Sequence, residues 1–339
     1  MIYKDKGHKK KKINIGIRIL RVILSYLVVF DHIYIYKMKY IYFLYYHIPT
    51  FFIISFYFTY NTLISFNINK IKLRFERLLI PYFSWSFISW LLINIHLLSF
   101  KIFLNTFKLF LYDLMNGHMF NVVLWFQNIL IMQTLIFLII IFLFKKNYLI
   151  ILSELSVIAY ILLYSGINYS FFNNNFSFKT ASTIGRLVEV FPFSLTGFFL
   201  ASTNIFKMLN KYRKITVFNC LAFLIIITKF TVFVDIQNFK YGGFRFNVAG
   251  ICIFIIFFLF PLEMKNQFMK SLFLKLTNFT GGIYFTHYLI GRKLLITQKI
   301  LSIQKRNFFG CIITYLISYI ICLFGTKIFG KTKIRHLFA

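Results

Sequence analysis

Acidic residues are scarce in this chain, with 8 Asp and Glu against 39 Lys and Arg among 339 residues. In a soluble protein, a formal net charge of +31 would suggest a nucleic-acid partner. This sequence is 59% hydrophobic with a mean hydropathy of +0.75, outside the usual range of soluble globular domains. Basic residues between apolar segments orient membrane proteins and attract anionic headgroups, so we expect membrane lipids as partners and no nucleic acid.

Several familiar signatures are also absent. The sequence contains no Walker loop, dinucleotide fingerprint, H-E-x-x-H or G-x-S-x-G motif, which argues against an ATP-driven pump and a soluble-type hydrolase. No small-residue cleavage site follows the basic start, so we expect the first apolar segment to stay as a helix. Neither a disulfide framework nor a metal site is expected, because the cysteines are scattered and form no C-x-x-C pair: Cys220, Cys252, Cys311 and Cys322.

Apolar runs of about twenty residues, long enough to cross a membrane as helices, recur along the chain. We predict ten, at 15–36, 41–66, 79–99, 122–144, 148–166, 186–203, 215–234, 246–262, 276–296 and 308–326. The longest connections expected between them are 100–121 and 167–185. The fold class is therefore an all-α polytopic membrane protein with about ten transmembrane helices, and any chemistry takes place inside the bundle or at its mouths.

The distribution of positive charge predicts the orientation. With a cytoplasmic N-terminus, the inner segments hold 23 Lys and Arg and the outer segments hold 12. The positive-inside rule then favours cytoplasmic N- and C-termini. We accordingly expect a basic N-terminal tail at 1–12, a single transmembrane domain at 13–326 and a basic C-terminal tail at 327–339.

Two ionisable residues in the first apolar segment, Arg21 and His32, are the first candidate site. Eleven helical steps place their side chains on one face, about 16 Å apart along the axis. Ionisable groups at membrane depth are costly unless they face a protein interior or water, so the pair indicates a shared cavity. A neutral imidazole there can act as a general base on a hydroxyl. The alternative is a structural histidine. Asp31 points about 100° away and is expected at the interface.

A second basic pair, Arg74 and Arg77, lies at the start of the third predicted helix. Residues three apart share a helix face, and two guanidinium groups there suit a phosphate-rich ligand. Ordinary positive-inside anchoring is the alternative.

Further candidates come from the fourth, sixth and ninth predicted helices. His287 lies at a depth comparable to that of His32, with Tyr284 one turn away on the same face, and both are candidate substrate contacts or packing residues. Trp125 is either a sugar-stacking side chain or an interfacial anchor. Arg186 and Glu189 are either an internal ion pair or part of a polar lining.

These residues together resemble a known family. The segment IRILRVILSYLVVFDH resembles the opening of the acyltransferase-3 family of bacterial membrane acyltransferases, whose signature is an arginine and a histidine separated by ten residues. RFER is similar to the second family motif of two arginines. VLWFQNILI, FPFSLTGFFLA, GGIYFTHYLI and KIRHLFA resemble weaker family blocks in the same order.

The resemblance implies a multi-pass protein of the bacterial cytoplasmic membrane that modifies surface polysaccharides. It would transfer an acyl group, commonly acetyl, from cytoplasmic acetyl-CoA or another acyl-CoA to a hydroxyl of an extracytoplasmic or lipid-linked glycan. By position, His32 is the essential histidine, Arg21 its motif partner, and Arg74 and Arg77 the contacts for the acyl-CoA phosphates.

The sequence departs from the family pattern at two positions. Arg18 stands where an acidic residue is usual, and Phe56 follows Ser55 where glycine is usual. A catalytically degenerate member of a glycan assembly complex is therefore one alternative. Another is a lipid-linked-glycan flippase that neutralises a pyrophosphate with Arg21, Arg186 and Lys229.

Overall fold

The chain is all-helical in the part that its computed structural model describes. That part comprises residues 14–33, 46–94, 100–116, 123–164, 178–203, 205–233, 244–259, 267–291 and 308–329, with Thr332, Arg335, Leu337 and Phe338. Within these ranges the segments are helices joined by short turns, without a strand. The all-α prediction is confirmed. The basic N-terminal stretch 1–12 lies outside the described residues.

Each of the ten predicted apolar segments overlaps a helix in the described residues, although the bounds differ. These helices are α1 (Ile15–Ile33), α2 (His47–Ile64), α3 (Ile68–Asn94), α5 (Leu124–Phe144), α6 (Tyr148–Tyr164), α8 (Phe178–Ser202), α10 (Arg213–Phe233), α11 (Phe244–Leu259), α13 (Thr280–Tyr288) and α14 (Phe308–Phe329). A 3-10 turn, η2 (Lys145–Asn147), joins α5 to α6.

Three further helices were not predicted from the sequence. They are α4 (Phe100–Asn116), α9 (Ile205–Lys211) and α12 (Gln267–Asn278). The interpretation of 100–121 as a plain connection was wrong, since α4 occupies most of it. Lys101, Lys108 and Asp113 interrupt its apolar residues. Helix α4 is therefore amphipathic, and a search for uninterrupted apolar runs misses it.

The apolar helices are those of a membrane protein. Three helical stretches in the described residues are long and apolar enough to cross a bilayer: Leu124–Leu162, Thr183–Ser202 and Phe309–Phe329. A shorter apolar helix covers Asn247–Leu259. Helix α1 is less apolar because it carries Arg18, Arg21 and Asp31. The number of crossings and the cytoplasmic location of both termini stay predictions.

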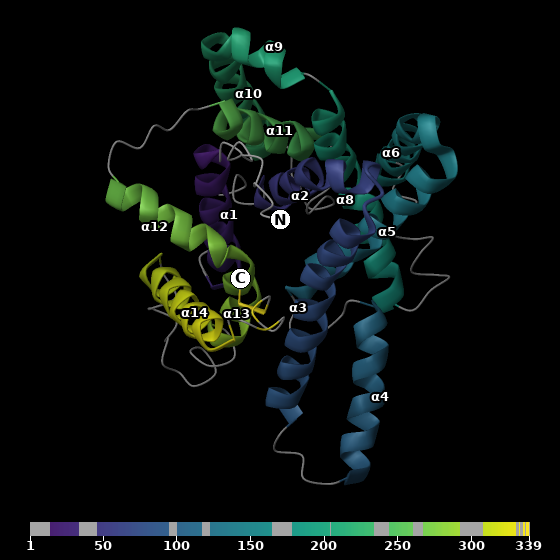
Figure 1. The fold of residues 1–339 in the computed structure, drawn as a ribbon, viewed down its shortest axis with the longest axis vertical. Helices are drawn as coiled ribbons and strands as arrows, with labels where there is room; N and C mark the ends of the chain where they lie inside the picture. The colour runs from purple at the N-terminus through teal and green to yellow at the C-terminus, as the bar shows by residue number, and fades with distance from the viewer. Residues whose placement is uncertain are drawn as a thin grey trace, which may run out of the picture.

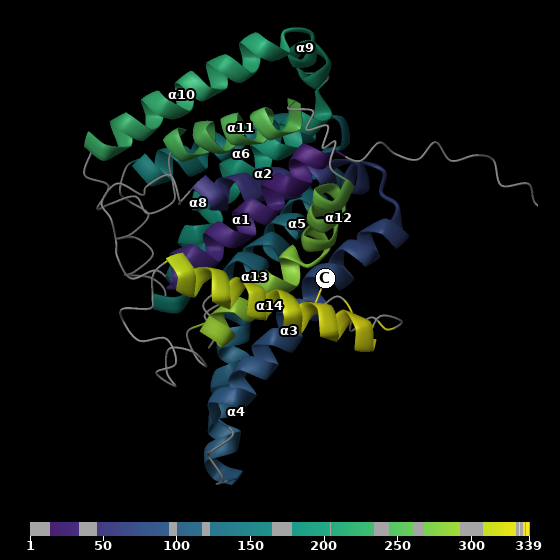
Figure 2. The ribbon, with the colours of Figure 1, turned by 90° about the vertical axis from the view of Figure 1, so that its left-hand side faces the viewer.

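Helix α2 lies in the middle of the bundle, against α8, α11, α1 and α5. Figure 1 shows α9 and α10 at one end of the molecule, and α3 and α4 extending together at the opposite end. Helix α1 is flanked by α11, α12, α13 and α14. The view in Figure 2 shows α10, α11 and α14 running across the long axis, with α1 among them. This packing brings the two ends of the chain's apolar part, α1 and α13–α14, together.

The end of the chain returns to the bundle. The Trp85 indole of α3 donates a hydrogen bond to the Leu337 carbonyl over 3.0 Å, and the Leu337 side chain is buried. Phe338 packs against the Trp85 ring and fills the space beside Gly325 of α14. Part of the predicted tail 327–339 therefore connects α3 to α14.

A glycine sets the close approach of α8 to α2. A Cβ atom on Gly197 would lie 2.2 Å from the Ile53 carbonyl oxygen, so a larger side chain forces the two backbones apart. Gly185, in the same helix, has no atom within 4 Å of such a Cβ. The two glycines are therefore a matched pair for testing this packing.

We predict that Gly197→Ala destabilises the protein by about 1–3 kcal/mol, the usual cost of overpacking a core. Gly185→Ala should be neutral or slightly stabilising, because alanine favours helix more than glycine does. Thermal unfolding of the two purified variants in detergent measures the difference. Equal midpoints for Gly197→Ala and wild type would contradict the close packing of α2 and α8.

Candidate functional site

Helix α1 runs parallel to α13, and two polar contacts join them. The Arg21 guanidinium donates from Nη2 to Thr280 Oγ1 over 3.1 Å at the start of α13. Near the end of both helices, the rings of His32 and His287 lie with centroids 5.3 Å apart. Thr277, in the last turn of α12, donates to the Arg18 carbonyl over 3.2 Å. The register between α1 and the α12–α13 segment is thus fixed by polar groups at both ends.

The histidine pair lies near the ends of α1 and α13, with His32 half-buried. His287 is fully buried, and its ring is inclined by 30° to that of His32. Tyr288 approaches His32 edge-on, with ring centroids 5.9 Å apart. Nδ1 of His287 lies 3.1 Å from the Ile283 carbonyl oxygen, one turn earlier in α13. Two imidazoles from helices far apart in sequence therefore occupy one level of the bundle.

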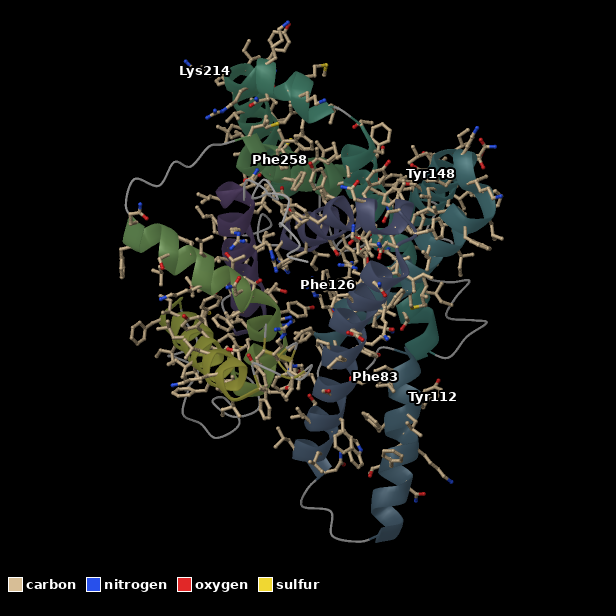
Figure 3. The ribbon with its side chains drawn as sticks, viewed as in Figure 1. Phe83, Tyr112, Phe126, Tyr148, Lys214 and Phe258 are labelled. Carbon is tan, nitrogen blue, oxygen red and sulfur yellow. The ribbon has the colours of Figure 1, made fainter. Side chains whose placement is uncertain are left out.

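A small cavity adjoins His32 between α1, α2, α5 and α13. Its walls combine polar with aromatic side chains: Val28, Asp31, His32, His47, Ile48, Phe51, Trp125, Phe126 and Tyr284. Figure 3 shows Phe126 in the middle of the bundle. The cavity encloses about 30 Å³, which holds water but is far below the ~300 Å³ of a small-molecule site. Binding of a sugar or a thioester therefore requires the surrounding helices to move apart.

Two residues of this cavity were missed or misplaced by the sequence analysis. Asp31 lines the cavity together with His32, although we expected it at the interface. The cavity wraps around the end of α1, so residues 100° apart both reach it. His47 is a third histidine, buried at the start of α2. His47 is not part of the arginine–histidine spacing that identified His32. The only feature of the sequence that indicates it is a histidine at the edge of an apolar segment.

Tyr284 and Trp125 reach the predicted site but are also engaged by protein groups. The Tyr284 hydroxyl donates to the Val123 carbonyl over 2.6 Å and so connects α13 to the start of α5. The Arg186 guanidinium lies 4.8 Å from the centre of the Trp125 ring, in a cation–π contact. Arg186 thus lies over one face of Trp125, which also lines the cavity.

Arg21 and Arg74 do not line the cavity. Arg21 is exposed and engaged with Thr280. The Arg74 Nη2 atom donates to Ser55 Oγ of α2 over 2.8 Å. Its Nε atom is buried, and no described residue accepts a hydrogen bond from it. Arg77, on the next turn, is exposed. The structure therefore separates the predicted arginines from the histidine cavity.

The two arginines are displaced from the cavity toward the same end of the bundle. The end of α11 contacts both the start of α1, through Asn14 and the Phe258 carbonyl, and the second half of α2, through Tyr57. Helices α1 and α2 therefore run antiparallel. Arg21 lies about 16 Å from His32 along α1, and Ser55, which holds Arg74, lies about 12 Å from His47 along α2.

No group of three or more potential metal ligands occurs among the described residues. The site is thus one of imidazoles, a carboxylate and aromatic rings, with guanidinium groups to one side.

Comparison with known proteins identifies the family to which the chain belongs. A family profile described as an acyltransferase domain, that of acyltransferase-3, matches residues 14–327. The chain belongs to the acyltransferase-3 family. No curated protein and no solved structure matches it. Its acyltransferase domain thus includes every candidate residue of the site.

The two departures from the acyltransferase-3 pattern are accommodated by the fold. Phe56 is fully buried in the core and packs on Phe137 with ring centroids 4.6 Å apart. Its neighbour Ser55 still reaches Arg74. Arg18 is half-buried, and its carbonyl receives the hydrogen bond from Thr277. Neither residue disturbs the helices that carry the histidines.

We predict that Tyr284→Phe lowers stability by about 1 kcal/mol, because it removes a hydrogen bond and leaves the Val123 carbonyl without its donor. Tyr319→Phe is a suitable control, because the Tyr319 ring packs on Phe279 and its hydroxyl has no hydrogen bond in the described structure. Thermal unfolding in detergent measures both. An equal loss in the two variants would show that the Tyr284 hydroxyl does not connect α13 to α5.

Proposed function

We propose that this membrane acyltransferase transfers an acyl group, acetyl in the first instance, from cytoplasmic acyl-CoA to a hydroxyl of an extracytoplasmic or lipid-linked glycan. The observation that carries the proposal is the cluster of buried His287 and His47 with half-buried His32 and Asp31, beside an aromatic-walled cavity. Imidazole is the side chain best suited to accept and release a proton near neutral pH. It is also a competent acyl carrier.

His32 can support the transfer by either of two routes. As a general base, its bare ring nitrogen takes the proton of the glycan hydroxyl as the oxygen attacks the thioester carbonyl. The carbon–sulfur bond then breaks, and the thiolate of coenzyme A takes the proton from His32. As a nucleophile, the same nitrogen bonds to the acyl carbon and expels the thiolate of coenzyme A, which leaves a cationic acylated ring. The glycan oxygen then displaces the ring, and the hydroxyl proton passes by way of the freed nitrogen to the thiolate. Both routes need one ring nitrogen bare and directed into the cavity.

The donor is expected on the side where the arginines lie. The buried Nε of Arg74 is a donor that no described residue satisfies, and a phosphate oxygen is a strong acceptor for it. Arg77 is exposed one turn away and adds a second positive charge. Because the pantetheine arm separates the phosphates of coenzyme A from its thioester, binding at the arginines leaves the acyl group free to reach toward His32. This end of the bundle would then be cytoplasmic, as the charge distribution predicts.

The acceptor is expected at the aromatic side of the cavity. Phe51, Trp125, Phe126 and Tyr284 contribute rings to its wall. Aromatic faces and edges suit the apolar faces of sugar rings, and the carboxylate of Asp31 can accept hydrogen bonds from sugar hydroxyls. We place the protein in the cytoplasmic membrane of a bacterium, with no metal in the reaction.

We predict that His32→Ala lowers glycan acylation by at least about 10²-fold, the usual contribution of a positioned acid–base group. Protein level and membrane insertion should be unchanged. His8→Ala, which removes a histidine preceding the acyltransferase domain, is the matched control and should retain full activity. The measurement is the amount of ester-linked acyl group on surface glycan from cells that express each variant.

Two results would contradict this assignment. Full acylation by His32→Ala would remove the histidine from the chemistry. Loss of the glycan itself from the surface, with normal ester content on what remains, would instead indicate a transporter of lipid-linked glycan.

We predict that Arg74→Ala weakens acetyl-CoA binding by about tenfold or more, because a charge-assisted bond to phosphate contributes roughly 1.5–3 kcal/mol. Lys214→Ala removes one exposed positive charge at the start of α10 (Figure 3) and should bind normally. Equilibrium binding of radiolabelled acetyl-CoA to purified protein tests both variants. Unchanged affinity in Arg74→Ala would place the donor elsewhere.

A further inference from the structure

The protonation state of His287 follows from its contacts. Its Nδ1 atom faces the Ile283 carbonyl oxygen at 3.1 Å, and a carbonyl only accepts hydrogen bonds. Nδ1 therefore carries the proton, and Nε2 of the neutral ring is a bare acceptor. This Nε2 atom is buried, and no described residue donates a hydrogen bond to it. A buried acceptor without a donor is costly in a folded protein and calls for an explanation.

The nearest titratable ring is His32. Two imidazoles joined edge to edge by an N–H···N bond have ring centres about 5 Å apart, given the usual donor–acceptor distance of about 3 Å. The observed separation is 5.3 Å with an inclination of 30°. This separation is compatible with an N–H···N bond between one nitrogen of His32 and Nε2 of His287.

We propose that His287 is a positioning residue for His32: its bare Nε2 accepts the His32 N–H and so fixes the tautomer whose other nitrogen faces the cavity. This inference rests on the proposed acyl transfer and assigns His287 a role different from substrate contact. A neutral imidazole carries one proton on two nitrogens, and the hydrogen bond made by one nitrogen decides which of them stays bare.

The hydrogen bond strengthens during the reaction. In the general-base route, the hydroxyl proton moves to the bare nitrogen of His32, and the ring becomes an imidazolium that keeps its second N–H on His287. In the nucleophilic route, bond formation to the acyl carbon likewise makes the ring cationic, and the N–H to His287 is again retained. In the general-base route the positive charge on His32 disappears when the ring protonates the departing thiolate. In the nucleophilic route the charge persists on the acylated ring and disappears after the glycan oxygen has displaced the ring and the hydroxyl proton has passed to the thiolate. His287 then returns to its starting state.

Other polar and aromatic groups surround the pair. Asp31 and His47 line the same cavity as His32. The Tyr288 and His32 rings pack edge to face, as do the Tyr284 and His287 rings with centroids 6.1 Å apart, while the Tyr284 hydroxyl is engaged by Val123. Within this cluster, the Ile283 contact at Nδ1 of His287 defines its Nε2 as the acceptor atom.

Two substitutions separate positioning from packing. His287→Leu replaces the imidazole with an apolar side chain of similar size and so removes the acceptor. His287→Gln keeps an acceptor oxygen near the position of Nε2. We expect kcat to fall by about 10²-fold or more in His287→Leu, with KM for acetyl-CoA unchanged, and we expect His287→Gln to recover most of the loss. Thermal unfolding checks that both variants are folded.

A second measurement does not depend on the glycan reaction. Diethyl pyrocarbonate acylates the bare nitrogen of a neutral imidazole, releasing ethanol and carbon dioxide. The rate of its addition to His32 in the purified protein can be followed by peptide mass spectrometry. If His287 exposes that nitrogen to the cavity, the rate should fall about tenfold in His287→Leu and stay near wild type in His287→Gln.

The outcomes distinguish this proposal from the function on which it rests. Equal modification rates in wild type and His287→Leu overturn the positioning role, whatever the glycan assay shows. Failure of His287→Gln to recover the rate in a folded protein also overturns it. The expected rate pattern in a protein that transfers no acyl group to glycan would support the histidine contact and reject the proposed function.

Discussion

The packing of α1 against the α12–α13 segment, with α1 and α13 parallel, is the constraint on which the site depends. Ionisable groups at membrane depth are tolerated only where protein or water satisfies them. Here Arg21 is bonded to Thr280 at one level, and His32 meets His287 at the other. A shift of one helix by a single turn would break both contacts and expose imidazole to lipid. The arrangement therefore fixes helix register and assembles the reactive groups at the same time.

The arginines lie apart from the histidines. They are about 12–16 Å along their helices from the histidine level, both toward the same end. Under the proposed function, the phosphates of the donor are therefore held without entering the small cavity. The cavity itself is small, with about 30 Å³ of space among aromatic side chains. Substrate access consequently involves a change in helix packing, which would also exclude bulk water from the thioester.

Sequence patterns predicted the apolar helices and selected candidate site residues, but the predicted cavity shared by Arg21 and His32 was wrong, because Arg21 bonds to Thr280 instead. Helical spacing selected His32, and matching depth selected His287, since both follow from local geometry. Helix α4 was missed because its charged residues interrupt an otherwise apolar run. His47 and the cavity position of Asp31 depend on how α2 approaches the end of α1, a tertiary contact that no spacing encodes. The Arg74–Ser55 bond is likewise visible only once α2 and α3 are placed.

The central claim is that acyl transfer takes place at the histidine pair, with the donor entering from the side of the arginines. An experimental structure of the protein with a non-hydrolysable acyl-CoA analogue tests it most directly. The account predicts the acyl carbon beside the His32 ring, the phosphates at Arg74 and Arg77, and an enlarged cavity between α1, α2, α5 and α13. An analogue bound with its acyl group remote from His32 would contradict it.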